Sequence, residues 1–352
     1  MSEVTKIEWA DSTFNPWLGC TKVSPACTNC YAEGWAKRSG LVQWGDRAER
    51  RRTTEAYWQQ PLKWNRQAAS SGKVFRVFGG SLCDWLDDRV PIAWLADYLA
   101  LIWRCQNLQW LLLTKRIESF RIRLELAAHH LAEWGQKDTA GDVLAWLDGA
   151  VPPFIALGVT AENQKYADER IPLLLQTPAG IRFISAEPLL GPINLPLAYC
   201  NNCFKFVGFR LVNNDKDYGC VKCGCYLNSM SPANRPGSFY QVAPLHWVIV
   251  GGESAPRARP MHPDWARSLQ RQCEAAGVSY FHKQNGEFAQ VSKADASHRL
   301  ESDGTLFTKR DAPEGSYLDT AWLKRVGKKA AGRLLDGREY SEFPEVSQCP
   351  AT

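Results

Sequence analysis

Short, uninterrupted apolar runs that alternate with helical patterns constrain the fold of this chain more than any other feature. The runs are too short for helices and rich in β-branched and aromatic residues, which is typical of strands buried on both faces. Because helical patterns separate them, they predict a parallel sheet built from βα units. The predicted strands are 7–9, 74–78, 110–113, 153–159, 181–184, 246–250 and 278–281. We therefore expect an α/β fold, with a full or partial TIM-like (β/α) barrel rather than an open sheet.

The last six predicted strands all end in glycines or in polar and charged residues. In a βα barrel the C-terminal ends of the strands form the active site, so these residues are expected on one edge. One such residue alone is more typical of a solvated loop, but six strands with this ending indicate a shared site. The residues are Gly79, Gly80, Ser81 and Asp84; Lys115 and Arg116; Glu162 and Asn163; Glu187; Gly251, Gly252 and Glu253; and Lys283 and Gln284.

A Cys-x6-Cys-x2-Cys motif follows the first predicted strand and consists of Cys20, Cys27 and Cys30. Thiolates are the ligands of iron–sulfur clusters and of zinc. Three thiolates without a fourth nearby would leave one metal position open, as a catalytic metal site requires. The alternative is a structural zinc site that a distant Cys or His completes.

A second cysteine group lies in a predicted insertion at residues 197–241. Two Cys-x2-Cys pairs, sixteen residues apart, match the spacing of a tetrahedral zinc ribbon. A segment this short cannot bury a core, so a metal would supply its folding energy. We expect zinc, with a rubredoxin-like single iron as the alternative. The four predicted ligands are Cys200, Cys203, Cys220 and Cys223.

The insertion divides the chain into four predicted parts. Residues 1–196 form the first part of the barrel and carry the cysteine motif, and residues 197–241 form the ribbon. The barrel resumes at 242–288, and 289–352 form a C-terminal tail or cap with weak strand signals. Helices are expected at 31–39, 91–104 and 263–276, the last with proline in its first turn and a glycine stop.

Composition is that of a soluble globular protein. The chain has 352 residues, 45 % hydrophobic and 22 % charged. No apolar run approaches the roughly 18 residues of a membrane span, and the N-terminus lacks an apolar signal core, so we expect no membrane association and a cytoplasmic location. Thiols stay reduced there, and the 12 cysteines are therefore read as metal ligands before disulfides. A net charge of +5 permits a nucleic-acid partner without requiring one.

A basic and aromatic segment follows the first predicted helix. Residues 44–52 contain four arginines, and Tyr57, Trp58 and Trp64 come shortly after them. Basic residues interleaved with aromatics suit a phosphate backbone with stacked bases. A solvated arginine face with the aromatics turned inward explains the pattern equally well.

Six segments between about residue 5 and residue 288 carry a specific combination of motifs. They are 15–33, 113–116, 157–163, 185–191, 248–254 and 283–284. Together they resemble the phage-associated three-Cys-motif family, also described as the Gp37/Gp68-like phage proteins. That family is in turn distantly similar to the radical S-adenosylmethionine (SAM) enzymes. Those enzymes have a partial barrel and hold a [4Fe-4S] cluster with three cysteines after their first strand, and SAM binds the fourth iron.

The resemblance implies that Cys20, Cys27 and Cys30 hold a [4Fe-4S] cluster and that SAM is a cofactor. The first cysteine spacing is six residues here and three in the radical SAM enzymes, and the Gly-Gly-Glu sequence follows a late strand instead of the second. Lys115, Glu187, Glu253 and Lys283 are the implied catalytic residues. The implied cofactor-binding residues are Gly79, Gly80, Ser81, Arg116, Glu162, Gly251 and Gly252.

The implied function is reductive cleavage of SAM to modify or repair a nucleic acid or nucleotide. The electron would come from a donor such as flavodoxin or ferredoxin, and a partner protein encoded nearby is a further expectation. In this hypothesis Lys115 or Arg116 neutralises the SAM carboxylate, and Lys283 faces the substrate. One alternative is an iron–sulfur and zinc-containing nucleic-acid-binding module without SAM turnover. Another is a barrel with two structural zinc sites that acts on a small metabolite.

Overall fold

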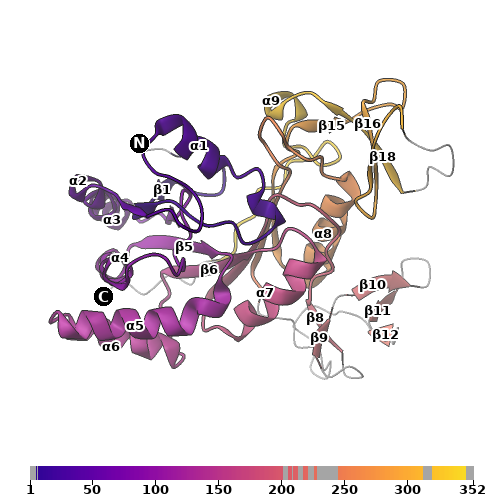
Figure 1. The fold of residues 1–352 in the computed structure, drawn as a ribbon. Helices are drawn as coiled ribbons and strands as arrows, with labels where there is room; N and C mark the ends of the chain where they lie inside the picture. The colour runs from indigo at the N-terminus through magenta and orange to yellow at the C-terminus, as the bar shows by residue number, and fades with distance from the viewer. Residues whose placement is uncertain are drawn as a thin grey trace. The chain divides into compact units, whose positions relative to one another are not determined.

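The computed structural model describes residues 5, 7–200, 205–207, 209–212, 217–220, 226–227, 245–311 and 319–345. The chain is a mixed α/β protein whose main sheet has seven strands, flanked by helices (Figure 1). None of the helices within these residues combines the length and the apolar character needed to cross a membrane.

The main sheet runs in the order β1-β4-β5-β6-β7-β13-β14. Its pairs β1–β4, β4–β5 and β5–β6 are parallel, as are β7–β13 and β13–β14. The predicted parallel sheet with intervening helices is therefore confirmed. The strands are β1 (Ser12–Phe14), β4 (Phe75–Gly79), β5 (Leu108–Thr114), β6 (Ile155–Thr160), β7 (Ile181–Ala186), β13 (Trp247–Gly251) and β14 (Ser279–Gln284).

The first strand was placed wrongly by the sequence pattern. Residues 7–9 do not form a strand but lead through a turn, in which the Ala10 amide donates to the Ile7 carbonyl, into β1. The buried Trp9 ring packs against Phe78 with 4.6 Å between ring centroids. The aromatic signal at residue 9 therefore comes from a turn that covers the neighbouring strand.

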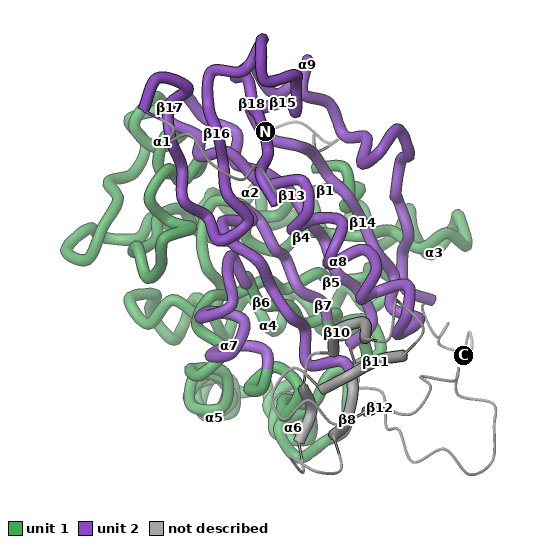
Figure 2. The backbone as a smooth tube through the Cα atoms, turned by 90° about the vertical axis from the view of Figure 1, so that its right-hand side faces the viewer, with its two compact units in different colours: residues 1–160, 172–182, 346–352 green, residues 161–171, 183–345 purple. Residues whose placement is uncertain are grey.

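The chain divides into two compact units, and the first comprises residues 1–160, 172–182 and 346–352 (Figure 2). Besides β1, β4, β5 and β6 it holds a short antiparallel pair, β2 (Trp17–Leu18) and β3 (Arg51–Arg52). Buried aromatic side chains of Phe14, Tyr98 and Trp110 meet edge to face or tilted in its core. Its helices are α1 (Tyr31–Ser39), α2 (Glu55–Trp58), α3 (Gln60–Ser71), α4 (Ile92–Arg104), α5 (Phe120–Glu133) and α6 (Lys137–Leu147).

The second unit comprises residues 161–171 and 183–345 (Figure 2). It contains the end of β7, then β13, helix α8 (Pro263–Ala276) and β14. Helix α7 (Gln164–Gln176) begins in this unit and ends in residues of the first. Helix α8 buries Trp265, Leu269 and Cys273, one every four residues, which is the apolar stripe of an amphipathic helix.

The C-terminal part of the second unit forms an antiparallel sheet that the sequence did not predict. Its order is β15-β18-β16-β17. The strands are short, and β18 buries alternate residues, so the apolar signal of each strand is weak. The elements are β15 (Phe288–Gln290), β16 (His298–Glu301), β17 (Leu306–Thr308), β18 (Thr320–Arg325) and α9 (Lys328–Ala331).

The predicted zinc ribbon falls on a region where the structure gives short strands. Cys203 and Cys223 lie outside the described residues, and so do the side chains of Cys200 and Cys220, so zinc binding and the predicted four-part division stay predictions. Two antiparallel groups, β8-β9 and β10-β11-β12, occupy this region. The strands are β8 (Ala198–Cys200), β9 (Lys205–Val207), β10 (Phe209–Val212), β11 (Asp217–Cys220) and β12 (Tyr226–Leu227).

Candidate functional site

The Cys loop, residues 19–30, connects β2 to helix α1 in the first unit. It begins at Gly19, whose φ of 104° favours glycine at this bend. Cys27 lies in a 3-10 turn, where its amide donates to the Ser24 carbonyl at 2.9 Å. Cys20, Cys27 and Cys30 are all free and half-buried thiols. The fold thus confines three metal-binding groups to one short loop.

Cys30 is the N-cap residue of α1. Burial raises the pKa of its thiol, while the nearby amides of Glu33 and Ala32 and the positive charge of Lys115 act in the opposite direction. Amides at a helix N-terminus stabilise negative charge on a nearby atom. Cys30 therefore occupies a position that favours a thiolate ligand once a metal replaces the proton.

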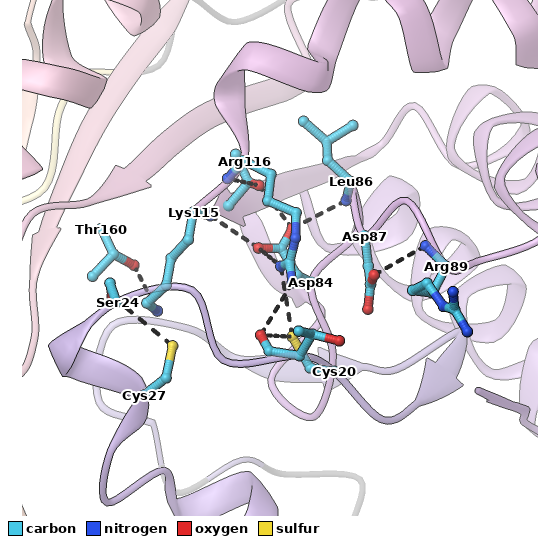
Figure 3. A network of polar contacts seen from close by, with 12 residues as sticks. Cys20, Ser24, Cys27, Asp84, Leu86, Asp87, Arg89, Lys115, Arg116 and Thr160 are labelled. Atoms are coloured by element: carbon cyan, nitrogen blue, oxygen red, sulfur yellow. Dashed lines mark hydrogen bonds and ion pairs between the residues drawn. The ribbon is translucent and has the colours of Figure 1, made fainter. Parts of the chain in front are cut away.

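Cys20 lies beside a guanidinium group. Arg116 Nη1 is 3.6 Å from Cys20 Sγ and 3.0 Å from Asp84 Oδ2, and Nη2 donates to the Thr21 carbonyl at 3.0 Å (Figure 3). Burial raises the pKa of Cys20 to about 12, helped by the negative charge of Asp84 and opposed by Arg116. Without a metal, the Cys20 thiol therefore stays protonated at neutral pH.

Asp84 fixes the ends of β4 and β5 against each other. Its carboxylate accepts from Thr114 Oγ1 at 2.7 Å, from the Lys115 amide at 2.9 Å and from the Leu86 amide at 3.1 Å, in addition to Arg116. All four donors surround one buried carboxylate (Figure 3). Asp84 thus has a structural role next to the Cys loop, because it joins several backbone and side-chain donors. Its position after a strand did not by itself predict this role.

A second buried ion pair supports the same loop. Arg50 Nε lies 2.8 Å from Asp87 Oδ2, and both side chains are 0 % exposed. Arg50 Nη2 also donates to Thr21 Oγ1 at 2.6 Å. Thr21 is therefore held by two arginines, Arg50 on its side chain and Arg116 on its carbonyl. The sequence pattern did not indicate Asp87, which lies in no recognised motif, or Thr21, which occupies a non-cysteine position of the Cys motif.

The basic and aromatic segment around Arg50 is largely structural. Trp58 and Trp64 are buried, and Arg52 lies over the Trp58 ring at 4.0 Å from its centroid. These tryptophans cannot stack on bases from solution. Trp58 and Trp64 therefore turn inward, as the second interpretation expects, whereas Arg50 is buried and does not belong to a solvated face.

Lys115 is the cation at the end of β5. Its Nζ donates to Thr160 Oγ1 at 3.1 Å, and the side chain is half-buried. In the close-up view it extends toward Thr160 (Figure 3). No carboxylate of the described residues forms an ion pair with this ammonium. A partly desolvated ammonium whose hydrogen-bond partner is neutral suits an anionic ligand.

The glycines predicted for the β4 end have internal roles. A Cβ on Gly79 would collide with the Tyr98 hydroxyl and lie 2.9 Å from Leu112, and Gly80 has a φ of +115°. The Ser81 hydroxyl bonds to the Asn15 side chain, and its carbonyl accepts from the Tyr31 hydroxyl at 2.6 Å. These contacts join the β4 end to residues on both sides of the Cys loop, and packing accounts for Gly79 while the backbone conformation accounts for Gly80.

In the second unit, Glu187 and Lys283 form a half-buried pair with 2.9 Å between Oε1 and Nζ. Ser185 Oγ donates to Glu187 Oε2 at 3.2 Å. A Cβ on Gly251 would lie 2.8 Å from Glu187 Oε1, so glycine is required for this approach. The structure thus brings together the ends of β7, β13 and β14, as predicted for these residues.

The other two predicted carboxylates of this unit are enclosed by arginines. Glu162 pairs with Arg170 at 3.1 Å. Glu253 pairs with Arg259 at 2.7 Å and also accepts from its backbone amide. Both carboxylates are buried and hold their own loops. A Cβ on Gly252 would collide with the backbone at Asn285, so chain packing explains this glycine too.

The residues of the Cys loop fit a thiolate-bound metal centre. Within the part of the chain that the structure describes, no three His, Cys, Asp or Glu side chains are already arranged around one metal position. The three thiols nonetheless share one loop, with the N-terminus of α1 at Cys30 and a guanidinium donor at Cys20. Hydrogen bonds to sulfur are a regular feature of iron–sulfur sites. The donor set therefore suits a cluster whose binding would draw the sulfurs together.

Comparisons with known proteins add a family. A search of curated proteins and a search of solved structures both find no match. One family model, described as "Protein of unknown function (DUF5131)", matches residues 4–344. This match spans nearly the whole sequence, and the chain belongs to that family.

Proposed function

We propose that this chain is a radical-SAM-like iron–sulfur enzyme with a partial βα barrel, acting on a nucleic acid or nucleotide. The observation that carries the proposal is the Cys loop, where three free thiols share one short segment, with Arg116 beside Cys20 and the charge of Lys115 acting on Cys30. When bound by Cys20, Cys27 and Cys30, a [4Fe-4S] cluster would supply the electron for reductive cleavage of SAM. The contacts of the individual residues support distinct roles for the two cations.

Lys115 is the better candidate to bind the carboxylate of SAM. Its ammonium has a neutral hydrogen-bond partner, Thr160, and faces the Cys loop. Arg116 is engaged by Asp84 and Thr21, so binding a ligand carboxylate would require it to leave both. A charge-assisted hydrogen bond from Lys115 would orient the cofactor without rearranging the loop.

The second unit carries polar strand-end groups of its own. The half-buried Glu187–Lys283 pair offers both an acceptor and a donor, which suits the hydroxyl and amide edges of a nucleotide. The enclosed Glu253 and Glu162 would have supporting roles. The net charge of +5 permits a nucleic-acid substrate, and the predicted zinc ribbon is consistent with one. The electron donor would be a small redox protein such as flavodoxin or ferredoxin.

The experiment that tests the proposal is anaerobic reconstitution of the full chain with iron and sulfide. Iron and zinc content are measured, and EPR spectra of the dithionite-reduced protein are recorded with and without SAM, while 5′-deoxyadenosine is followed by chromatography. A cluster signal that shifts with SAM, together with 5′-deoxyadenosine formation, is the expected result. A cluster that ignores SAM, with salt-dependent nucleic-acid binding, would support the binding-module alternative. Zinc in place of iron at the Cys loop would refute the proposal.

A further inference from the structure

We propose that the buried Arg116–Asp84 pair positions Cys20 and sets the reduction potential of the metal centre at the Cys loop. The inference rests on the proposed iron–sulfur function, because it concerns the environment of that centre. Arg116 and Asp84 are positioning residues in this proposal. They act through Cys20 and do not bind the metal.

The geometry of Arg116 links three groups at once. Nη1 lies within reach of both Cys20 Sγ (3.6 Å) and Asp84 Oδ2 (3.0 Å), and Nη2 donates to the carbonyl of Thr21, the residue next to Cys20. The planar guanidinium fork fixes the directions of these donors relative to one another. One side chain thereby positions both the sulfur and the backbone that carries it.

Asp84 has hydrogen-bond donors enough without Arg116. It already accepts from Thr114, the Lys115 amide and the Leu86 amide, so its carboxylate would be hydrogen-bonded if the arginine were absent. Burying a second charge beside it costs desolvation energy, and stability alone is weak grounds for such a pair. What Arg116 adds is a positive N–H donor at the Cys20 sulfur.

The two charges of the pair act on a bound cluster in opposite directions. Reduction makes an iron–sulfur centre more negative, so the positive charge of Arg116 and its hydrogen bond to sulfur favour the reduced form. The negative charge of Asp84 disfavours the reduced form, both directly and by drawing the guanidinium toward itself. The potential then reflects the balance between the two, and removing one charge should shift it with a definite sign.

The test is a mediated redox titration of the iron-loaded full chain, monitored by EPR, for the wild type and the variants R116Q, R116K and D84N. We expect R116Q to be harder to reduce and D84N to be easier, each by about tenfold in the reduction equilibrium, or about 59 mV for a one-electron couple. R116K keeps the charge and should restore part of the shift seen in R116Q. Shifts of opposite sign are the readout that a merely structural role would not give.

Arg50→Gln is the matched control. Arg50 is also a buried arginine that binds Thr21 and pairs with an aspartate. The guanidinium beside the Cys20 sulfur belongs to Arg116, so this variant leaves that contact in place. It should lower stability while shifting the potential less than R116Q. If R116Q fails to fold, D84N and R116K still carry the comparison. Equal potentials in D84N, R116K and the wild type, or shifts of D84N and R116Q in the same direction, would overturn the inference. A wild-type protein that takes up no iron would instead refute the proposed function on which it rests.

Discussion

The strand ends of the two units treat their charged residues differently. In the second unit, Glu162 and Glu253 each form an ion pair with an arginine a few residues away, so the charge of each carboxylate is neutralised by its own loop. In the first unit, the Arg116 guanidinium contacts the sulfur of a cysteine, and the Lys115 ammonium donates a hydrogen bond to a neutral hydroxyl. The comparison teaches that a charged residue at a strand end indicates a ligand-binding site only when no ion pair within its own loop already neutralises the charge. On this criterion, the first unit is the place to look for a metal and an anionic ligand.

The largest expected effect is on iron content, which should depend on cysteines of the first unit and not on a cysteine of the second. Replacing Cys20, Cys27 or Cys30 by serine should lower the iron content of reconstituted protein at least tenfold, since even loss of a group that only supports a ligand costs about 10- to 100-fold in affinity. Cys273→Ala, at a buried cysteine of α8 in the second unit, is the control and should keep its iron. Full iron content in all three serine variants would remove the metal assignment from the Cys loop.

The second largest expected effect is the loss of stability when either of two ion pairs is broken, one buried and one partly exposed. Asp87→Asn leaves the fully buried Arg50 without its carboxylate and should cost about 3–5 kcal/mol of unfolding free energy. Glu253→Gln should cost less, about 1–2 kcal/mol, because Arg259 is 32 % exposed and water screens it. Guanidinium denaturation followed by tryptophan fluorescence measures both. Similar losses would show that exposure of the arginine does not decide the cost.

A third prediction sharpens the comparison at the two lysines. Lys115→Met should weaken SAM binding to the iron-loaded protein about tenfold or more, because a charge-assisted hydrogen bond contributes about 1.5–3 kcal/mol. Lys283→Met, whose lysine is paired with Glu187, should leave SAM affinity nearly unchanged. Isothermal titration calorimetry under anaerobic conditions gives both values. The division of roles between the units fails if the second variant loses as much affinity as the first.

The smallest effect concerns mild acid and the second unit. Burial lowers the pKa of His262 and of His282 from the ordinary value of 6.5, so the unfolded chain binds protons more readily than the native one below that pH. The unfolding free energy should therefore be unaffected by these residues above pH 6.5 and should fall as the pH drops toward their native pKa values. The slope is at most about 1.4 kcal/mol per pH unit for each histidine.

His282→Gln should flatten that decline in a series of denaturation curves between pH 7.5 and 5. His129→Gln, at an exposed histidine of helix α5 in the first unit, is the control for the loss of a histidine outside the second unit. An unchanged slope in the His282 variant would show that protonation of this residue does not limit the acid stability of the unit.

The sequence predicted the sheet well because buried parallel strands carry their signal locally. The uninterrupted apolar runs that became β5, β6 and β13 are legible without knowledge of their neighbours. The strands of the C-terminal sheet were missed because they are short and depend on pairing partners distant in sequence, such as His298 with Leu323. At Trp9 the error was the reverse, because a strand was predicted where there is none. An aromatic residue in a turn can be as buried as one in a strand.

The candidate site was only partly predictable, because its electrostatics depend on tertiary pairing. The cysteine spacing and the positions of Lys115 and Arg116 could be read from the chain, and the structure places them around the same loop. That Arg116 faces a sulfur and an aspartate, whereas Arg259 faces Glu253, depends on side-chain directions that no motif records. The same limit hid Asp87, whose partner Arg50 lies 37 residues away.

Thr21 has a consequence for how the loop could assemble a metal centre. Because Arg50 holds its hydroxyl and Arg116 holds its carbonyl, the backbone beside Cys20 has lost its conformational entropy when the chain folds, before any ion arrives. A metal bound by the three thiols would therefore meet the Cys20 sulfur on backbone that the fold has already ordered, and less conformational entropy would be lost there on binding.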